Sequence, residues 1–165
     1  MLIDEVENVW ISVSATSRKP REGEVDGKSY YFLSREDFQT MISENGFLEW
    51  AEYSGNFYGT PKKYVEEHLR AGDVVVLEIE VQGAKDVMEK CDGCRSIFIE
   101  PPSIDELERR LRGRGTETEE AIRLRLRAAK RELDSSSDYE KIIVNDDLGL
   151  AFSELKEYIN RLANK

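Results

Sequence analysis

Val74–Leu77, with the sequence Val-Val-Val-Leu, decides the fold class and lies in an expected strand over Asp73–Val81. A continuous apolar run of this kind is typical of a strand buried on both faces of a parallel sheet. The segments Ser96–Ile99 and Ile142–Val144 have the same character, and helical patterns lie between them. Strands that alternate with helices predict a three-layer α/β fold with a mainly parallel sheet.

Further strands are expected nearer the amino terminus. Trp10–Ala15 alternates apolar and polar residues, as a half-buried strand does. Asp26-Gly27 is a hairpin turn signal, so Tyr30–Leu33 is expected to return as the partner strand. Phe47–Tyr53 predicts another short strand.

Capping residues mark the helix boundaries. Ser34 is expected to cap a helix that carries Phe38 on its apolar face. Thr60-Pro61 predicts a helix start, because a hydroxyl cap precedes a proline at the first helical position, and Gly72 ends that helix. Three more helices are expected, from a capping box at Ser103 through Leu111, over Thr118–Leu133, and over Leu150–Leu162.

The 165 residues are predicted to form a single domain, and an apolar fraction of 39% is enough for a core. The formal net charge of −10 argues against nucleic acid as a partner, because an acidic chain gains nothing from counterion release. Positive charge gathers instead in two clusters, Arg18–Arg21 and Arg109–Arg131. Local clusters of this kind suit a small anionic ligand.

No stretch is long and apolar enough to span a bilayer, and the acidic first ten residues lack a secretory signal. A cytoplasmic location without a membrane partner is therefore expected. Cys91 and Cys94 form a single C-x-x-C, and the only histidine, His68, is distant from them in the sequence. Because a zinc site needs four ligands, we interpret the cysteines as part of a turn and predict no metal site. The sequence does not indicate an oligomeric state.

Ser14, Arg18, Arg21 and Tyr30 form the first candidate site. Two guanidinium groups can neutralise a dianionic phosphate with paired hydrogen bonds, and serine and tyrosine hydroxyls can complete the shell. Charge alone favours a simpler alternative, a solvated basic turn. The residues follow the spacing Ser-x-x-x-Arg-x-x-Arg and then Gly-Glu-x-x-Gly-x-x-Tyr.

This spacing resembles, position for position, the GMP site of guanylate kinases, and the resemblance runs from about Asn8 to Leu162. The resemblance implies a P-loop-kinase-like fold and the phosphorylation of GMP to GDP by ATP, with Mg²⁺ as the accompanying metal. It also implies a GMP-binding subdomain over about residues 30–80 and a helical lid over about 110–130. The residues that it assigns to the phosphate of GMP are Arg18, Arg21, Tyr30 and Tyr58, with Ser14 as a further GMP-binding candidate.

Glu49 is the candidate that reads the base. A carboxylate is the natural partner of the two adjacent N–H groups of guanine, although a lone glutamate is more often a surface residue. Within Phe-Leu-Glu-Trp-Ala-Glu, followed by Tyr-Gly-Thr, it resembles the base-reading glutamate of the family. Thr60 then has two candidate roles, helix cap and donor to guanine O6. Glu78 and Glu80 end the buried strand, where acidic residues face the ligand crevice, and relatives use this segment for the nucleoside or the water shell of the metal.

Arg110, Arg114 and Arg125 are the candidate catalytic residues. The run Glu-Arg-Arg-Leu-Arg-Gly-Arg-Gly-Thr-Glu-Thr-Glu-Glu resembles the lid of guanylate kinases, in which arginines stabilise charge on the transferring phosphoryl group. The alternative is an exposed helix with internal salt bridges, such as Glu106 with Arg110. Asn145 resembles the residue near the adenine of ATP.

The phosphate-loop sequence G-x-x-x-x-G-K-[ST] does not occur in these 165 residues. The only Gly-Lys pair, Gly27-Lys28, lies in a turn before Tyr30 and not at the start of a helix. In the family the loop follows the central first strand of the sheet, so that strand is expected to be missing here as well, and activity of the chain as given is doubtful.

Three interpretations remain open at this point. The chain is a guanylate kinase whose recorded start is internal, a GMP-binding remnant without kinase activity, or a guanylate-kinase-like module that binds partner proteins. The retained Arg18, Arg21, Tyr30, Glu49 and Tyr58 rank the interaction module last, because such modules commonly lose these contacts.

A polypeptide of these 165 residues alone is expected to transfer essentially no phosphoryl group from ATP to GMP. Positioning and charge neutralisation supply most of the catalysis in this class of reaction, and the phosphate loop provides both. A version extended by the strand, loop and helix of a relative should be active and more stable. A coupled assay of ADP release on both proteins tests this, and robust turnover by the shorter one would contradict it.

Overall fold

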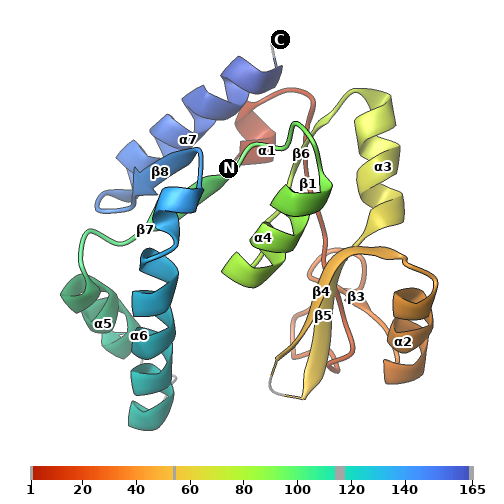
Figure 1. The fold of residues 1–165 in the computed structure, drawn as a ribbon, viewed down its shortest axis with the longest axis horizontal. Helices are drawn as coiled ribbons and strands as arrows, with labels where there is room; N and C mark the ends of the chain where they lie inside the picture. The colour runs from red at the N-terminus through yellow and green to blue at the C-terminus, as the bar shows by residue number, and fades with distance from the viewer. Residues whose placement is uncertain (1, 54, 114–117, 164–165) are drawn as a thin grey trace. The chain divides into compact units, whose positions relative to one another are not determined.

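The computed structural model describes residues 2–53, 55–113 and 118–163, which form a mixed α/β structure (Figure 1). The chain divides into two compact units, Met1–Asp92 with Ile159–Lys165, and Gly93–Tyr158. The elements up to residue 92 are α1 (Leu2–Glu5), β1 (Val9–Ile11), β2 (Ala15–Thr16), β3 (Tyr31–Phe32), α2 (Arg35–Ser43), β4 (Phe47–Tyr53), β5 (Asn56–Pro61), α3 (Lys62–Ala71), β6 (Val74–Val76) and α4 (Val81–Lys90). Those that follow are β7 (Ile97–Glu100), α5 (Ile104–Gly113), α6 (Glu119–Leu133), the 3₁₀ turn η1 (Ser136–Asp138), β8 (Lys141–Val144) and α7 (Leu148–Ala163).

Three sheets organise these elements. β1 pairs with β6 and β7 pairs with β8, both in parallel, and helices lie between the paired strands in the sequence. This arrangement fits the predicted α/β class with parallel pairing. The third sheet is mixed and has the order β3-β2-β5-β4. Within the described ranges, each of the four strands in the two parallel pairs has a single strand partner.

Most predicted helices are confirmed together with their caps. Ser34 caps α2, its hydroxyl accepting the Asp37 N–H at 3.0 Å, and Phe38 is buried. Gly72 ends α3 with a φ of 91°, a left-handed conformation that glycine adopts without strain. The Ser103 and Thr118 hydroxyls accept backbone N–H groups at the starts of α5 and α6.

The expected hairpin between Trp10–Ala15 and Tyr30–Leu33 is wrong. The first segment splits into β1 and β2, which belong to different sheets, and β3 pairs with β2 in parallel. The chain already reverses within residues 26–30, where the Gly27 N–H donates to the Tyr30 carbonyl at 2.8 Å. A long loop therefore brings β3 back beside β2 in the same direction.

Two boundaries near the candidate site also differ from expectation. The strand expected over Asp73–Val81 ends at Val76, and α4 begins at Val81. Thr60 and Pro61 belong to β5, and the helix after them begins at Lys62 without a side-chain cap. The Thr60 hydroxyl does not cap this helix because it donates to Glu49.

The core of the mixed sheet is aromatic. Phe38 of α2 is fully buried, and its ring stacks on Phe47 at 4.3 Å and on Phe57 at 5.3 Å between centroids. Ala15 of β2 completes this cluster of buried residues. Figure 1 shows β4 and β5 as a long hairpin, with α2 on one side of it. The cluster therefore fixes α2 against the strands that carry the candidate GMP-binding residues.

Phe38→Ala is expected to lower the free energy of unfolding by about 3–5 kcal/mol, because it removes a fully buried ring and leaves a cavity. Gln39→Ala, at the exposed neighbouring position, is the matched control and should change stability little. Urea titration of both variants measures the difference. Equal unfolding midpoints would show that the aromatic cluster does not hold this part of the structure together.

Candidate active site

A register shift in the β4–β5 pair determines where Glu49 points. Phe47 pairs with Pro61 and Trp50 pairs with Gly59, so β4 has one more residue than β5 between these two pairs. Such a β-bulge turns side chains away from regular alternation. The Trp50 ring meets the Phe57 ring edge to face, and Phe47 belongs to the same buried cluster as Phe57, so both lie on one face of the strand pair. Glu49 lies on the other face with Thr60.

The Glu49 carboxylate is buried beside Thr60. The Thr60 hydroxyl donates to Glu49 Oε1 at 2.6 Å, and the two residues are 0% and 8% exposed. The first turn of α4 closes the other side, because a β-carbon built on Gly83 would lie 2.7 Å from Glu49 Oε2. Glycine at this position lets the helix approach the carboxylate.

Burial raises the pKa of Glu49 above its ordinary value. Hydrogen bonds from the Thr60 hydroxyl and backbone N–H oppose that rise; Asp86 adds to it and Lys90 reduces it. A carboxylate in this setting gains from further N–H donors, since they stabilise its charged form. The geometry suits a ligand that presents an N–H edge.

Arg18 and two tyrosines gather at the neighbouring part of the sheet. The Arg18 guanidinium lies 5.4 Å from the centroid of the Tyr30 ring, and the Tyr30 and Tyr58 rings meet edge to face at 6.1 Å. The pKa of Arg18 is raised, chiefly by its hydrogen bond to Glu24 and also by one to Tyr58. The structure thus brings together three of the four residues predicted to bind phosphate.

The start of the Arg18 loop is fastened to β5. The Thr16 hydroxyl donates to the Phe57 carbonyl at 2.9 Å, and the Phe57 N–H donates to Ser17 Oγ at 2.8 Å. Arg21 is exposed in this loop, and its backbone N–H donates to Glu24 at 2.6 Å. The Ser14 carbonyl accepts the Tyr31 N–H, which joins β3 to β2.

Glu78 and Glu80 lie in the segment between β6 and α4 and are exposed. Glu80 occupies the N-cap position of α4 but makes no side-chain cap hydrogen bond. In the described part of the chain, neither carboxylate is hydrogen-bonded to Glu49 or Arg18. Both residues therefore lie outside the strand that was expected to carry them.

Arg110 links α5 to the segment after β8 in the second unit. Its Nη1 donates to the Asn145 carbonyl at 2.8 Å, its Nη2 to the Asp146 carbonyl at 3.2 Å, and its Nε to Glu106 at 2.7 Å. A predicted catalytic arginine and the predicted adenine-binding residue are thus in direct contact. Arg125 is exposed on α6, and Arg114 lies outside the described residues.

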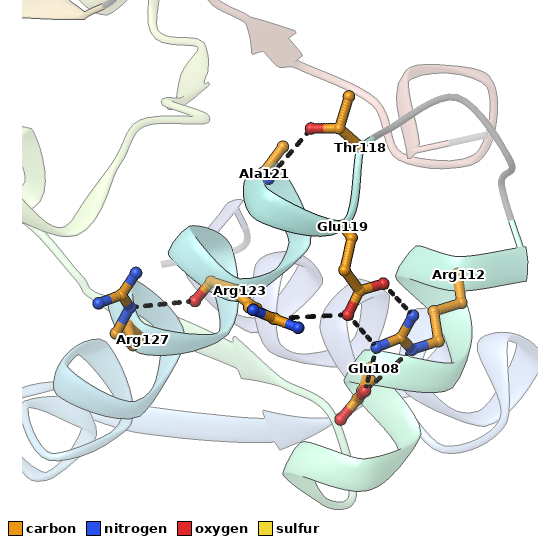
Figure 2. A network of polar contacts seen from close by, with 7 residues as sticks. All are labelled: Glu108, Arg112, Thr118, Glu119, Ala121, Arg123 and Arg127. Carbon is orange, nitrogen blue, oxygen red and sulfur yellow. Dashed lines mark hydrogen bonds and ion pairs between the residues drawn. The ribbon is translucent and has the colours of Figure 1, made fainter.

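The end of α5 and the start of α6 are joined by ion pairs (Figure 2). Arg112 donates to Glu108 at 2.7 Å and to Glu119 at 2.5 Å, and Arg123 Nε lies 3.6 Å from Glu119. All four side chains are substantially exposed, so these pairs contribute little to stability individually. The salt-bridged exposed helices considered as an alternative are thus present, and Arg110 itself pairs with Glu106.

Neither a cluster of metal ligands nor a membrane-spanning helix occurs in the described residues. They contain no group of three or more His, Cys, Asp or Glu side chains arranged to hold a metal ion. They also contain no helix with the length and apolar character needed to cross a bilayer.

Glu24 and Gly83 contact the candidate site but were not among the residues predicted from the sequence. Glu24 follows Arg21 by three positions inside the Gly-Glu pattern, and that spacing was the available signal. An isolated glycine between Gln82 and Ala84 was the corresponding signal for Gly83, because such a glycine often marks a close approach.

Comparison with known proteins bears on the whole chain. The profile of the family described as guanylate kinase matches residues 1–162. A guanylate kinase of Parasynechococcus marenigrum (strain WH8102) is 52% identical over 149 residues, which cover 90% of this chain and 82% of the relative. One of Desulfitobacterium hafniense (strain Y51) is 51% identical over 158 residues, covering 96% and 79%.

A solved structure gives the same result for the fold. The crystal structure of guanylate kinase from Anaplasma phagocytophilum superposes with a TM-score of 0.79 at 37% sequence identity, covering 96% of this chain and 78% of that one. The α/β architecture is therefore that of the P-loop-kinase-like fold. Since the profile and relatives of about half identity both extend over nearly all of its length, the chain belongs to the guanylate kinase family.

Proposed function

We propose that the protein transfers a phosphoryl group from ATP to GMP when the phosphate loop that does not occur in these 165 residues is supplied, and that the mixed sheet of its first unit binds the GMP. The single observation that carries the assignment of the site is the buried Glu49 carboxylate beside Thr60, next to the group formed by Arg18, Tyr30 and Tyr58. Tyr58 and Thr60 are two residues apart in β5, a separation of about 7 Å along a strand. That separation is on the scale of a single nucleotide.

Glu49 would read the guanine base. Its carboxylate accepts from the N1–H and the exocyclic amino group, a donor pair that adenine lacks. The Thr60 hydroxyl has one proton and donates it to Glu49 in the free protein. On GMP binding this hydroxyl would turn from the carboxylate to donate to O6. The pair therefore accounts for base selection without any further residue.

Arg18 and Arg21 would neutralise the phosphate of GMP, with the hydroxyls of Tyr30 and Tyr58 as additional donors. Paired guanidinium groups match the charge and geometry of a phosphate dianion. Ser14, Glu78 and Glu80 remain candidate contacts to the nucleotide. The phosphate oxygen of GMP that attacks ATP would thus be held between β5 and a loop fastened to that strand.

The second unit would bind ATP. The contact of Arg110 with the carbonyls of Asn145 and Asp146 supports adenine binding at this segment, since the arginine fixes its backbone. Arg110, Arg114 and Arg125 are proposed to stabilise charge on the transferring phosphoryl group. Family members use ATP with Mg²⁺, and the roles proposed for the arginines do not depend on a metal site in this chain.

The protein should bind GMP more tightly than AMP, and Glu49→Gln should weaken GMP preferentially. The lost charge-assisted hydrogen bonds are worth about 1.5–3 kcal/mol. The protonated Glu49 side chain cannot accept both N–H groups. The GMP affinity of the wild type is therefore highest at pH values above the raised pKa of Glu49, and it declines as the pH falls through that pKa. Calorimetry at neutral and mildly acidic pH measures both effects.

The phosphate of GMP titrates in the same pH range, but it does so equally with both proteins. The difference between the wild-type and Glu49→Gln profiles therefore isolates the carboxylate. Parallel profiles, or equal affinities of a folded sample for GMP and AMP, would rule out Glu49 as the base reader.

Arg18→Ala and Arg21→Ala are each expected to raise the dissociation constant of GMP by about tenfold or more, since each removes a charged partner of a dianion. The affinity for guanosine should barely change, because guanosine has no phosphate. Titration of each variant with both ligands provides the comparison. An equal loss for GMP and guanosine would mean that these arginines act on the structure of the loop and not on the phosphate.

A further inference from the structure

The Glu24 carboxylate binds the guanidinium of Arg18 and the backbone of Arg21, the two arginines that are proposed to bind phosphate. Its Oε2 accepts from Arg18 Nη1 at 2.9 Å, and its Oε1 accepts from Arg18 Nη2 at 2.8 Å, which makes the pair bidentate. The same Oε2 accepts the backbone N–H of Arg21 at 2.6 Å. One carboxylate thus joins the two arginines across the loop that connects β2 to β3.

These contacts leave the Arg18 side chain little freedom. The guanidinium also donates to the Lys19 carbonyl at 2.7 Å and lies over the rings of Tyr30 and Phe32. The side chains of Arg18 and Glu24 are 14% and 20% exposed, although Lys19, Pro20 and Arg21 around them are exposed. Three of the five guanidinium N–H groups are engaged by Glu24 and Lys19, which fixes the direction of the remaining edge.

We propose that Glu24 is a positioning residue for the phosphate of GMP and acts through Arg18. A flexible arginine loses rotamer freedom when it binds an anion, and a side chain that is already fixed loses less. Glu24 would supply that order in advance and would also fold the loop so that Arg21 comes close to Arg18. The proposal rests on the GMP site proposed above and adds a residue that does not itself contact the nucleotide.

Electrostatic repulsion alone predicts that loss of the Glu24 charge strengthens GMP binding, whereas positioning predicts that it weakens GMP binding. A carboxylate near a phosphate dianion repels it, so removal of the charge without any positioning role would tighten GMP binding. If positioning dominates, removal of the same charge weakens binding. The sign of the change therefore distinguishes the two physical effects.

The variant to test is Glu24→Gln, with Glu22→Gln as the matched control. Glu22 is an exposed carboxylate in the same loop, so its replacement removes an equal charge from nearly the same place. Glu24→Gln should raise the dissociation constant of GMP by about tenfold, the effect of one charge-assisted hydrogen bond, and leave that of guanosine unchanged. Glu22→Gln should leave GMP affinity unchanged or slightly increased, and Glu24→Asp should recover part of the loss.

A double-mutant cycle shows whether Glu24 acts through Arg18. In the Arg18→Ala background, Glu24→Gln should have little further effect on GMP affinity, because the guanidinium that it positions is gone. Full additivity, tighter GMP binding, or an equal loss for GMP and guanosine would each overturn the proposal. Melting temperatures of all variants identify any that fail to fold. If Glu24→Gln fails, Glu24→Asp carries the test, because it keeps the charge: positioning predicts weaker GMP binding, and electrostatics alone predicts no change.

The same data separate this inference from the assignment of the site. If Arg18→Ala weakens GMP but Glu24→Gln does not, the role of Glu24 is wrong and the GMP site stands. If Arg18→Ala also leaves GMP affinity unchanged, the proposed phosphate site is wrong and the role of Glu24 falls with it.

Discussion

The single extra residue in β4 between Phe47 and Trp50 is the constraint on which the candidate site depends. Regular alternation would place Phe47 and Glu49 on one face and Trp50 on the other. The bulge lets Phe47 and Trp50 share the aromatic face and sends the Glu49 carboxylate to the face of Thr60. A buried carboxylate and a buried aromatic cluster can then occupy opposite faces of the β4–β5 pair.

β5 joins the two halves of the proposed GMP site. Phe57 belongs to the core, while Tyr58 and Thr60 serve the proposed phosphate and base contacts. The backbone of Phe57 is bonded in both directions to Thr16 and Ser17, which begin the loop that carries Arg18. The groups proposed to hold the base and the phosphate are therefore attached to the same strand, and their separation is set by backbone geometry and not by flexible side chains.

Sequence patterns correctly predicted those features that depend on neighbouring residues alone, such as the ends of helices. The Ser34 hydroxyl and the Gly72 conformation mark helix ends wherever the chain folds, so the sequence placed α2 and α3 nearly correctly. Thr60-Pro61 carried an equally good helix signal, but the hydroxyl is taken by a carboxylate that lies eleven positions earlier in the chain. Nothing in the local pattern shows that competition, and the parallel pairing of β3 with β2 also depends on how a long loop returns.

The candidate site also contains some residues that the sequence predicted and some contacts that it did not. Family spacing indicated Arg18, Tyr30 and Tyr58, and the structure places them together. The apolar run did not predict that β6 ends at Val76, which leaves Glu78 and Glu80 in the segment before α4. The bonds of Arg110 to two backbone carbonyls could not be predicted, since carbonyls carry no residue identity. Motif spacing indicates the proposed ligand contacts, whereas the contacts that support them become visible only in the fold.

The close approach of Gly83 to Glu49 makes these two positions interdependent for protein engineering. A β-carbon at position 83 would lie 2.7 Å from Glu49 Oε2, so even alanine needs the carboxylate to move. In a library that randomises position 49 to change base preference, only side chains that fit beside Gly83 of α4 would therefore be compatible with the fold. Shortening residue 49 creates space for a larger residue at 83, which would then reach the proposed base site from the helix. Redesign of nucleotide choice in this scaffold is therefore a problem of two coupled positions.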